Sequence, residues 1–538
     1  MIGDDAASRG RTNVSGTHRC RLLATVAALT LLSAATGTAR AGDGDAPRAV
    51  TATSAARPVL ALSLKEAIIR AIRNNPDADI ARIDLSIAYE GIDEARGVFD
   101  PLFQAGVGGG RNRDPNFNAP LPGTNVTISG LPPGLTVNPS TQFNWNGGFG
   151  WRSPLGTDLS LRYDFQRRTT QSRFLLNPTV TPSGGINVTQ PLLRGFGIDV
   201  NKAAITIART QRDIAAAQLD SSLQELAFQV EQAYWLYRGT IEAVRVAEKA
   251  LETAQKLLER TEAFARVGES TRLEVLEAQV GVVTRQEQLI RARNDRDNAR
   301  DGLLRLITAP RQRRAWDVDV VLLDAPRVRE ERFDVRLALA QALAHRPELV
   351  ALERAIEVET SQRLLAENDR LPRLDLVGGW SNTGLGSSHH NAHEALLSGR
   401  YYRWNVGLQF ELPLFNTRAR AAARAARERI RRAQRQRDSL EQQVVLEVRS
   451  AIRDILAARE RLRTTELGIR LAEEQLEREI ARRDAQLATN FEVLQREEDL
   501  TDARNAHVAA QVDYAIARAR YERVRGNMLR RFSIEIAP

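Results

Sequence analysis

The sequence predicts a mainly α-helical protein with a smaller β part, built as two copies of one internal repeat. Three observations support this fold class. Long stretches contain no proline, similar phrases recur in the same order in both halves, and shorter segments alternate apolar and polar residues. Of the 538 residues, 27% are charged and only 5% are aromatic, which is typical of long helices rather than of a compact enzyme.

Residues 1–41 have the features of a secretory signal peptide. Several arginines precede a short apolar run at 22–35, and a small-x-small site follows at 39–41. The run is too short to span a membrane, and no later stretch is long enough for a transmembrane helix. Cleavage would remove Cys20, the only cysteine, and so exclude disulfides and thiol chemistry. The alternative is an internal hydrophobic helix in a protein that is not exported.

Two long proline-free stretches predict long helices. No proline lies between Pro191 and Pro310, and none lies between Pro413 and Pro538. Inside both stretches apolar residues recur every three or four positions, as in coiled coils. An ordinary dimeric coiled coil is the simpler alternative for these segments taken alone.

The surroundings of these stretches are duplicated. The phrase LEVLEAQ at 273–279 returns as FEVLQRE at 491–497, and the prolines before them repeat in the same order. We therefore predict a first repeat at 62–310 and a second at 334–530, joined by linkers at 42–61 and 311–333 and followed by a tail at 531–538. Each repeat has a short helix, strands, a long helix, a tip and another short helix. The predicted helices are 64–98, 196–266, 273–308, 334–370, 417–487 and 491–528.

The segments at 102–191 and 372–413 predict β-strands. Alternation places aromatic residues on one face, as in strands that face lipid on one side and water on the other. A strand of a soluble sandwich alternates in the same way. One chain offers about four to six strands, too few to close around a pore, so several chains are needed. Segments 111–141 and 381–400 read as exposed loops. The lipid-facing candidates are Phe143, Trp145, Trp151, Tyr402, Trp404 and Phe410.

Five motifs together resemble the TolC family of outer-membrane efflux channels over about residues 60–530. They are FDPLF at 99–103, TQPLLRGFG at 189–197, LPLFN at 412–416 and the two tip phrases. The resemblance implies a homotrimer with a long α-helical coiled-coil barrel in the periplasm. Each chain would add four strands to a shared 12-stranded antiparallel β-barrel in the outer membrane. The linker and tail would form an equatorial belt, and a hairpin at 143–168 would be an addition to the family pattern.

The same resemblance implies an exit duct of a tripartite efflux pump or a type I secretion system. Such a protein is not an enzyme, needs no cofactor, and works with a periplasmic adaptor (membrane fusion) protein and an inner-membrane transporter. The cargo could be drugs, metals or proteins. The family's periplasmic aperture would correspond to Glu492 and Gln495, and Glu274 and Glu277 are candidates for tip or adaptor contacts. The alternative is a periplasmic adaptor or a structural coiled-coil protein that bridges the envelope.

Two further clusters allow alternatives. His389, His390 and His393 have a spacing that could bind a metal, although histidines in a Gly/Ser/Asn-rich segment are more often surface residues. A dense basic stretch could contact anionic lipid head groups or form a solvated helix surface, while an exported chain gives little reason to expect nucleic acid. The arginines are Arg418, Arg420, Arg424, Arg427, Arg429, Arg431, Arg432, Arg435 and Arg437.

Overall fold

The computed structural model describes most of the chain beyond the predicted signal peptide. That peptide, residues 1–41, lies outside the described residues, as do most of the linker at 42–61 and the last four residues. All described residues belong to one compact unit, Arg57–Pro538. Among their helices, none combines the length and the apolar character needed to cross a membrane. The described ranges are 58–118, 134–170, 176–310, 316–326, 331–485 and 487–534.

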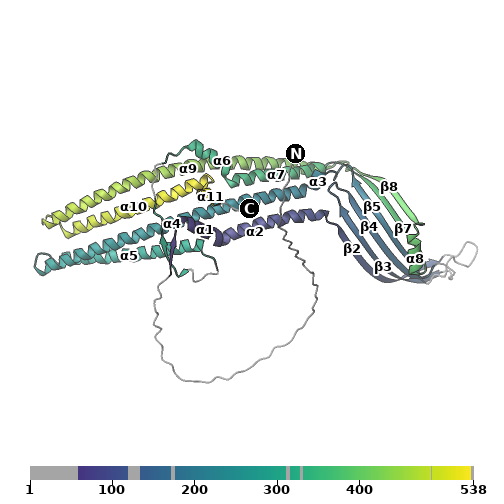
Figure 1. The fold of residues 1–538 in the computed structure, drawn as a ribbon, viewed down its shortest axis with the longest axis horizontal. Helices are drawn as coiled ribbons and strands as arrows, with labels where there is room; N and C mark the ends of the chain where they lie inside the picture. Colours follow the sequence, from purple (N-terminus) through teal and green to yellow (C-terminus); the bar gives the residue numbers. More distant parts are fainter. Residues whose placement is uncertain are drawn as a thin grey trace, which may run out of the picture. The chain divides into compact units, whose positions relative to one another are not determined.

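The predicted mainly helical fold with a β part is confirmed, and apart from the short helices α3, α8 and α11 the two repeats have the same helix order (Figure 1). The first repeat contains α1 (Leu64–Asn74), α2 (Pro76–Arg96), α3 (Ile198–Asn201), α4 (Ala203–Arg266) and α5 (Arg272–Ile307). The second repeat contains α6 (Val335–His345), α7 (Pro347–Asn368), α8 (His389–Leu397), α9 (Thr417–Asp484), α10 (Asn490–Val524) and α11 (Met528–Arg531).

Each predicted first helix of a repeat is in fact two helices. Pro76 and Pro347 occupy the first turns of α2 and α7, and the residues before them, Asn75 and Arg346, are extended with ψ of 129° and 119°. Proline has no N–H and forces the preceding residue out of the helical region, so the chain breaks there. The proline itself then starts the next helix, because its fixed φ suits the first turn.

Each long helix packs against two shorter helices of its own repeat. Helices α2 and α5 both lie along α4, and α7 and α10 both lie along α9. Helix α4 also contacts α7 and α10, so it is the element that joins the two repeats (Figure 1). In each repeat, two shorter helices therefore run beside one long helix.

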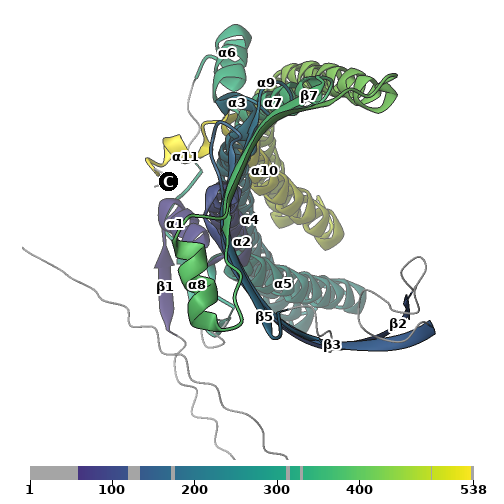
Figure 2. The same cartoon turned by 90° about the vertical axis from the view of Figure 1, so that its right-hand side faces the viewer.

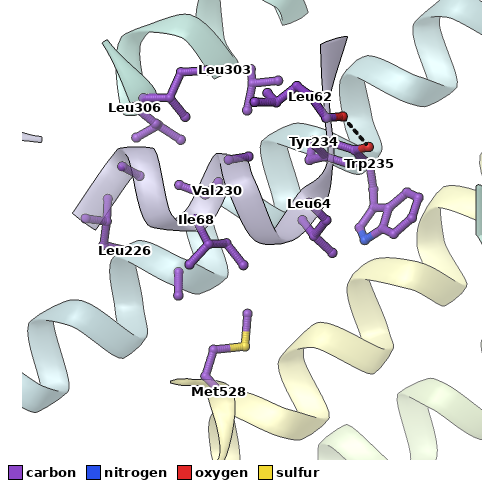
Figure 3. Packing of buried hydrophobic residues seen from close by; sticks show 14 of the residues in the cluster. Leu62, Leu64, Ile68, Leu226, Val230, Tyr234, Trp235, Leu303, Leu306 and Met528 are labelled. Atoms are coloured by element: carbon purple, nitrogen blue, oxygen red, sulfur yellow. Dashed lines mark hydrogen bonds between the residues drawn. The ribbon is translucent and has the colours of Figure 1, made fainter. Parts of the chain in front are cut away.

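The main core lies where a two-stranded parallel sheet meets α1, α4, α5 and α11 (Figure 3). Its strands are β1 (Val59–Leu62) and β6 (Asp319–Leu322), which belong to segments that the sequence had suggested were linkers. Two tyrosines of α4 hold them. The Tyr234 hydroxyl donates to the Leu62 carbonyl at 3.1 Å, and the Tyr237 hydroxyl donates to the Val320 carbonyl at 3.1 Å.

In the part of the chain that the structure describes, all the other strands form one antiparallel sheet of six (Figures 1 and 2). Six strands agree with the four to six that the sequence offers and exceed the four per chain that the family resemblance implies, because the hairpin at 143–168 pairs on both sides inside the sheet. In spatial order the strands are β2 (Leu102–Asn118), β3 (Gly134–Arg152), β4 (Asp158–Thr170), β5 (Thr179–Pro191), β7 (Arg373–Thr383) and β8 (Tyr402–Glu411).

The turn between β3 and β4 is fixed at the helix end of the sheet. Gly197 N donates to Leu155 O at 3.4 Å, and the Thr157 hydroxyl donates to Gln190 Oε1 at 2.5 Å. Gly156 has φ of +93°, and a Cβ there would lie 2.5 Å from Gly195 O, so only glycine suits this position. The predicted motif at 189–197 thus wraps the turn of the additional hairpin.

The segments expected to be exposed loops differ from that expectation. Strands β2 and β3 continue pairing to Asn118 and Gly134, so much of 111–141 is extended ladder, and 119–133 lies outside the described residues. Within 381–400, residues 389–397 form α8, which begins where the Ser388 hydroxyl accepts from Asn391 N at 3.3 Å.

Candidate functional site: the hairpin tips and the two faces of the sheet

The duplicated phrase begins the returning helix after each hairpin tip. Thr271 and Glu274 form a capping box at the start of α5: the Thr271 hydroxyl accepts from Glu274 N at 3.3 Å, and Thr271 N donates to Glu274 Oε2 at 2.9 Å. Thr489 and Glu492 form the same box on α10, with distances of 3.3 and 2.7 Å. The shared Thr-x-x-Glu pattern satisfies backbone N–H groups that a helix start leaves unpaired.

The predicted aperture residue Glu492 is therefore also a cap. Hydrogen bonds from the backbone and hydroxyl of Thr489 hold the pKa of its carboxyl below the ordinary value. Gln495 is exposed one turn further along α10. In the first repeat Glu274 caps α5, and Glu277 lies partly exposed on the next turn.

Polar contacts join the two hairpins near their tips. Arg260 of α4 pairs with Asp484 of α9 at 2.9 Å, and Asn490 Nδ2 of α10 donates to the hydroxyl of the buried Thr261 at 3.1 Å. Because these contacts connect α4 to α9 and α10, any outward movement of the second tip has to break them.

A half-buried carboxylate lies about two turns beyond this junction along α10. Burial raises the pKa of Glu497 to about 7, although the positive charges of Arg285 and Arg483 act in the opposite direction. Arg285 of α5 is buried, with 6% of its surface exposed, and lies 3.8 Å from Glu498 of α10. The contact between α5 and α10 thus contains a group that titrates close to neutral pH.

The six-stranded sheet has one apolar and one polar face. The register places Trp145 opposite Phe165 and Trp404 opposite Trp380, so aromatic residues of different strands share a face. Asn144, Asn146 and Asn405 alternate with them and point to the other face. All six lipid-facing candidates lie on the apolar face and are exposed, between 41% for Trp145 and 67% for Trp404.

The histidine cluster belongs to a helix, not to an open loop. In α8, His389 stacks on Phe165 with ring centroids 5.1 Å apart, and His393 Nε2 lies 2.7 Å from the Tyr163 hydroxyl. His393 Nδ1 lies 2.8 Å from His389 O, so protein atoms contact both of its ring nitrogens. Within the described residues, no group of three or more His, Cys, Asp or Glu could hold a metal ion.

The basic stretch at 418–437 forms the first turns of α9, next to the end of the sheet. Several of its arginines are ion-paired: Arg427 with Glu367 at 3.2 Å, and Arg431 with Glu428 at 2.9 Å. Their charge is thus partly neutralised within the chain, and contact with anionic lipid at this end of the sheet stays a prediction.

The paired helical hairpins and the amphipathic sheet recur in known proteins. A family model described as outer membrane efflux protein matches residues 151–309 and 338–527, which is more than half of the chain. The chain belongs to the outer membrane efflux protein family. The TolC-family resemblance is thereby confirmed, and the chain is an outer-membrane protein with a periplasmic portion.

Two curated relatives match parts of this efflux family member. It is 29% identical over 330 residues to the alkaline protease secretion protein AprF of Pseudomonas aeruginosa, which covers 58% of this chain. It is 25% identical over 340 residues to the outer membrane efflux protein BepC of Brucella suis, which covers 63% of this chain. The matches span 65% of AprF and 70% of BepC.

A solved structure has the same fold as this efflux family member. The CmeC outer membrane channel of Campylobacter jejuni superimposes with a TM-score of 0.62 at 14% identity, over 86% of this chain and 85% of that chain. Family and fold are those of channel proteins rather than of enzymes. The family match begins at Trp151, so β2 and nearly all of β3 lie outside it.

Proposed function

We propose that this chain forms the outer-membrane exit duct of a tripartite efflux pump or a type I secretion system. The observation that carries the proposal is the open sheet, which is apolar on one face and polar on the other and continues directly into the long helical hairpins. Such a sheet suits a wall between lipid and water. The helices then extend the conduit into the periplasm. The protein conducts passively, and the transport energy comes from its partner.

Exposed apolar stripes support assembly into a homotrimer. Along α5, apolar residues at heptad-like spacing are each at least half exposed. Helix α2 carries a similar stripe, and the exposed Leu446, Leu467 and Leu471 lie on α9. Exposed apolar stripes of this length indicate an interface with another protein surface. Packing of α2 and α5 of one copy on α9 of the next would bury them. The stripes consist of Ile80, Ile83 and Ile87 on α2, and of Leu273, Leu276, Val280, Val283 and Ile290 on α5.

The sheet supports a barrel of eighteen strands rather than twelve. In the described residues, β2 and β8 are the edges of the sheet and each pairs on one side only. Exposed edges are unfavourable, and in a membrane every backbone N–H and C=O needs a partner. Pairing β8 of one copy with β2 of the next satisfies both edges. Six strands from each of three copies then give eighteen, a size at which barrels leave an aqueous channel.

The tip of the second hairpin is the best candidate for the aperture. Three copies would place Glu492 and Gln495 around the threefold axis, where carboxylates attract cations. The capping bonds from Thr489 keep each Glu492 carboxyl ionised at neutral pH. Glu274 and Glu277 at the first tip are then available to a periplasmic adaptor. The inner-membrane transporter chooses the cargo, and the names of AprF and BepC leave protein secretion and efflux both open.

Conductance across a planar bilayer tests the proposal. Purified trimer is expected to give discrete, cation-preferring current steps, and Glu492→Gln is expected to reduce the cation preference without preventing insertion. Gln495→Glu serves as the matched variant and should increase the preference. A monomeric protein that carries no current would contradict the proposal.

Cell fractionation separates this proposal from the alternative of a periplasmic adaptor or a structural coiled coil. The duct is expected in the outer-membrane fraction and should require detergent for extraction. Recovery in the soluble periplasmic fraction without detergent would favour the alternative.

A further inference from the structure

Helix α8 is seated on the apolar face of the sheet. Its residue Ala392 is buried against Phe165 and Val180, and Figure 2 shows the helix on the convex side of the curved sheet. The helix also packs closely on the segment before it, because a Cβ at Gly386, which bridges to Val180 of β5, would lie 2.6 Å from Ala392 N. The helix lies at the end of the sheet that is distant from the long helices (Figure 1). On the proposed function, this end of the convex face meets the outer leaflet of the membrane.

A groove of about 540 Å³ runs across the strands beside α8. Gly147 of β3 and Gly184 of β5 form its floor, because glycines leave space between the larger side chains. Its lining is mostly apolar, so it suits an acyl chain, which needs no hydrogen-bond partner. The walls include Trp145, Phe149, Leu161, Trp380, Leu396 and Leu397.

Two arginines lie on the same face just beyond the aromatic band. Arg111 of β2 is opposite Thr141 and Arg167 of β4 is opposite Phe143, so the two arginines lie on either side of β3. Both side chains are exposed to the surroundings of the sheet. Two strand spacings of about 4.8 Å and the two-residue offset along β3 place their Cα atoms roughly 12 Å apart. This spacing suits a ligand that carries more than one phosphate.

We propose that this surface binds a phosphorylated, multiply acylated glycolipid of the outer leaflet. One acyl chain occupies the groove between the glycine floor and α8, and the phosphates contact Arg111 and Arg167. The inference rests on the proposed function, because it requires the convex face to meet lipid. This glycolipid site is separate from the lipid contact predicted for the basic stretch at 418–437, because the start of α9 lies at the opposite end of the sheet.

Native mass spectrometry of the purified trimer tests the head-group contacts. The probes are a bisphosphorylated, hexa-acylated glucosamine disaccharide, the same lipid without phosphates, and phosphatidylglycerol. We expect the trimer to retain the first probe, and the double variant Arg111→Gln/Arg167→Gln to bind it about thirty-fold more weakly, at about 1 kcal/mol per arginine. Arg403→Gln is the matched control, because Arg403 lies at the same end of the sheet on the polar face.

The groove has its own pair of variants. Gly147→Leu/Gly184→Leu is expected to reduce retention of the phosphorylated glycolipid at least ten-fold. A Cβ at either position would contact its neighbours at no less than 3.9 Å, so the sheet can accept the change. Gly378→Leu is the control on the same face, where a Cβ would meet nothing within 4 Å.

The outcomes separate this inference from the proposed function. A conducting trimer that retains none of the phosphorylated glycolipid, retains phosphatidylglycerol equally well, or loses the glycolipid equally in the Arg403→Gln control would overturn the inference alone. A protein that neither forms trimers nor conducts would overturn the proposed function as well.

Discussion

The two hairpins start their returning helices with the same capping box but present different surfaces afterwards. On α5 the exposed positions after the box include Val280 and Val283, and on α10 the corresponding residues are Glu498 and Thr501. Helix α10 packs against α5 of its own chain. A Cβ added at Gly281 of α5 would lie 3.2 Å from the side chain of Leu494 of α10. The apolar stripe of α5 has no such cover within the described residues of one chain.

This difference assigns separate tasks to the two copies of the repeat. The first repeat contributes large buried side chains such as Tyr234 and Trp235 and forms most of the main core. The buried positions of α9 are mainly small, including Ala423, Ala426 and Ala433. The second hairpin is attached to the first by packing of α10 on α4 and by the polar contacts near its tip. We therefore expect the first hairpin to hold the assembly together and the second to move when the aperture opens.

The largest expected effect is the loss of the trimer when the α5 stripe becomes charged. Leu276→Asp/Val280→Asp places two carboxylates in the surface that we assign to the neighbouring copy, where burial of unpaired charge is costly. Size-exclusion chromatography with light scattering should show monomers. Val267→Asp, at a tip residue that is 71% exposed, is the control and should remain trimeric. A trimeric Leu276→Asp/Val280→Asp variant would exclude this surface as the interface.

The next effect contrasts the cores of the two repeats. Leu303 of α5 and Val448 of α9 are both fully buried. Leu303→Ala should lower the free energy of unfolding by about 2–5 kcal/mol, and Val448→Ala by less, since it removes one carbon fewer. Thermal unfolding followed by circular dichroism measures both variants. Equal or reversed losses would mean that the α9 core contributes more stability per removed carbon than the α5 core, which contradicts the first repeat as the main support.

Of the two repeated phrases, only FEVLQRE at 491–497 is expected to make the stability depend on pH, because Glu497 stands where LEVLEAQ has Gln279. Because folding raises its pKa to about 7, the stability it contributes is complete below about pH 4.5 and is lost as the pH rises through 7. Glu497→Gln should therefore raise the stability at pH 8 by on the order of 1 kcal/mol after solvent screening, with little change at pH 4.5. Melting temperatures at both pH values test this. A variant whose melting curve depends on pH as the wild type does would refute it.

The smallest effect should be the same in both hairpins. Thr271→Ala and Thr489→Ala each remove a helix cap and should cost about 1 kcal/mol locally. Hydrogen exchange should accelerate at the first-turn amides of α5 and α10, including those of Glu274 and Glu492, which donate to the lost hydroxyls. Serine at either position keeps the hydroxyl and should restore protection. Exchange that stays slow in the alanine variants would mean that the caps carry no local stability.

The sequence predicted the features that depend on periodicity and on proline. The absence of proline over 192–309 and the three- and four-residue spacing of apolar residues located α4 and α5 closely, and strand alternation placed Trp145 and Trp404 on one face. The Thr-x-x-Glu boxes were also present in the sequence, since Thr271 and Thr489 precede both phrases by the spacing that a cap requires. The charge of Glu492 alone does not indicate this capping role.

Other features could not be obtained from the sequence alone. Periodicity shows that one side of α5 is apolar, but it does not show whether the chain itself or another copy covers that side. Helix α8 has only nine residues in a Gly/Ser-rich segment, and its seat on Phe165 depends on contacts between distant parts of the chain. The turn between β3 and β4 is likewise anchored by a contact between distant residues, the hydrogen bond from Thr157 to Gln190.

Electron cryo-microscopy of the protein in lipid nanodiscs tests most directly whether three copies jointly wall one pore. We expect threefold symmetry, a closed barrel of eighteen strands, and β8 of each copy hydrogen-bonded to β2 of the next. A closed barrel of twelve strands with β3 and β4 outside the wall, or a sheet that stays open in lipid, would contradict this arrangement.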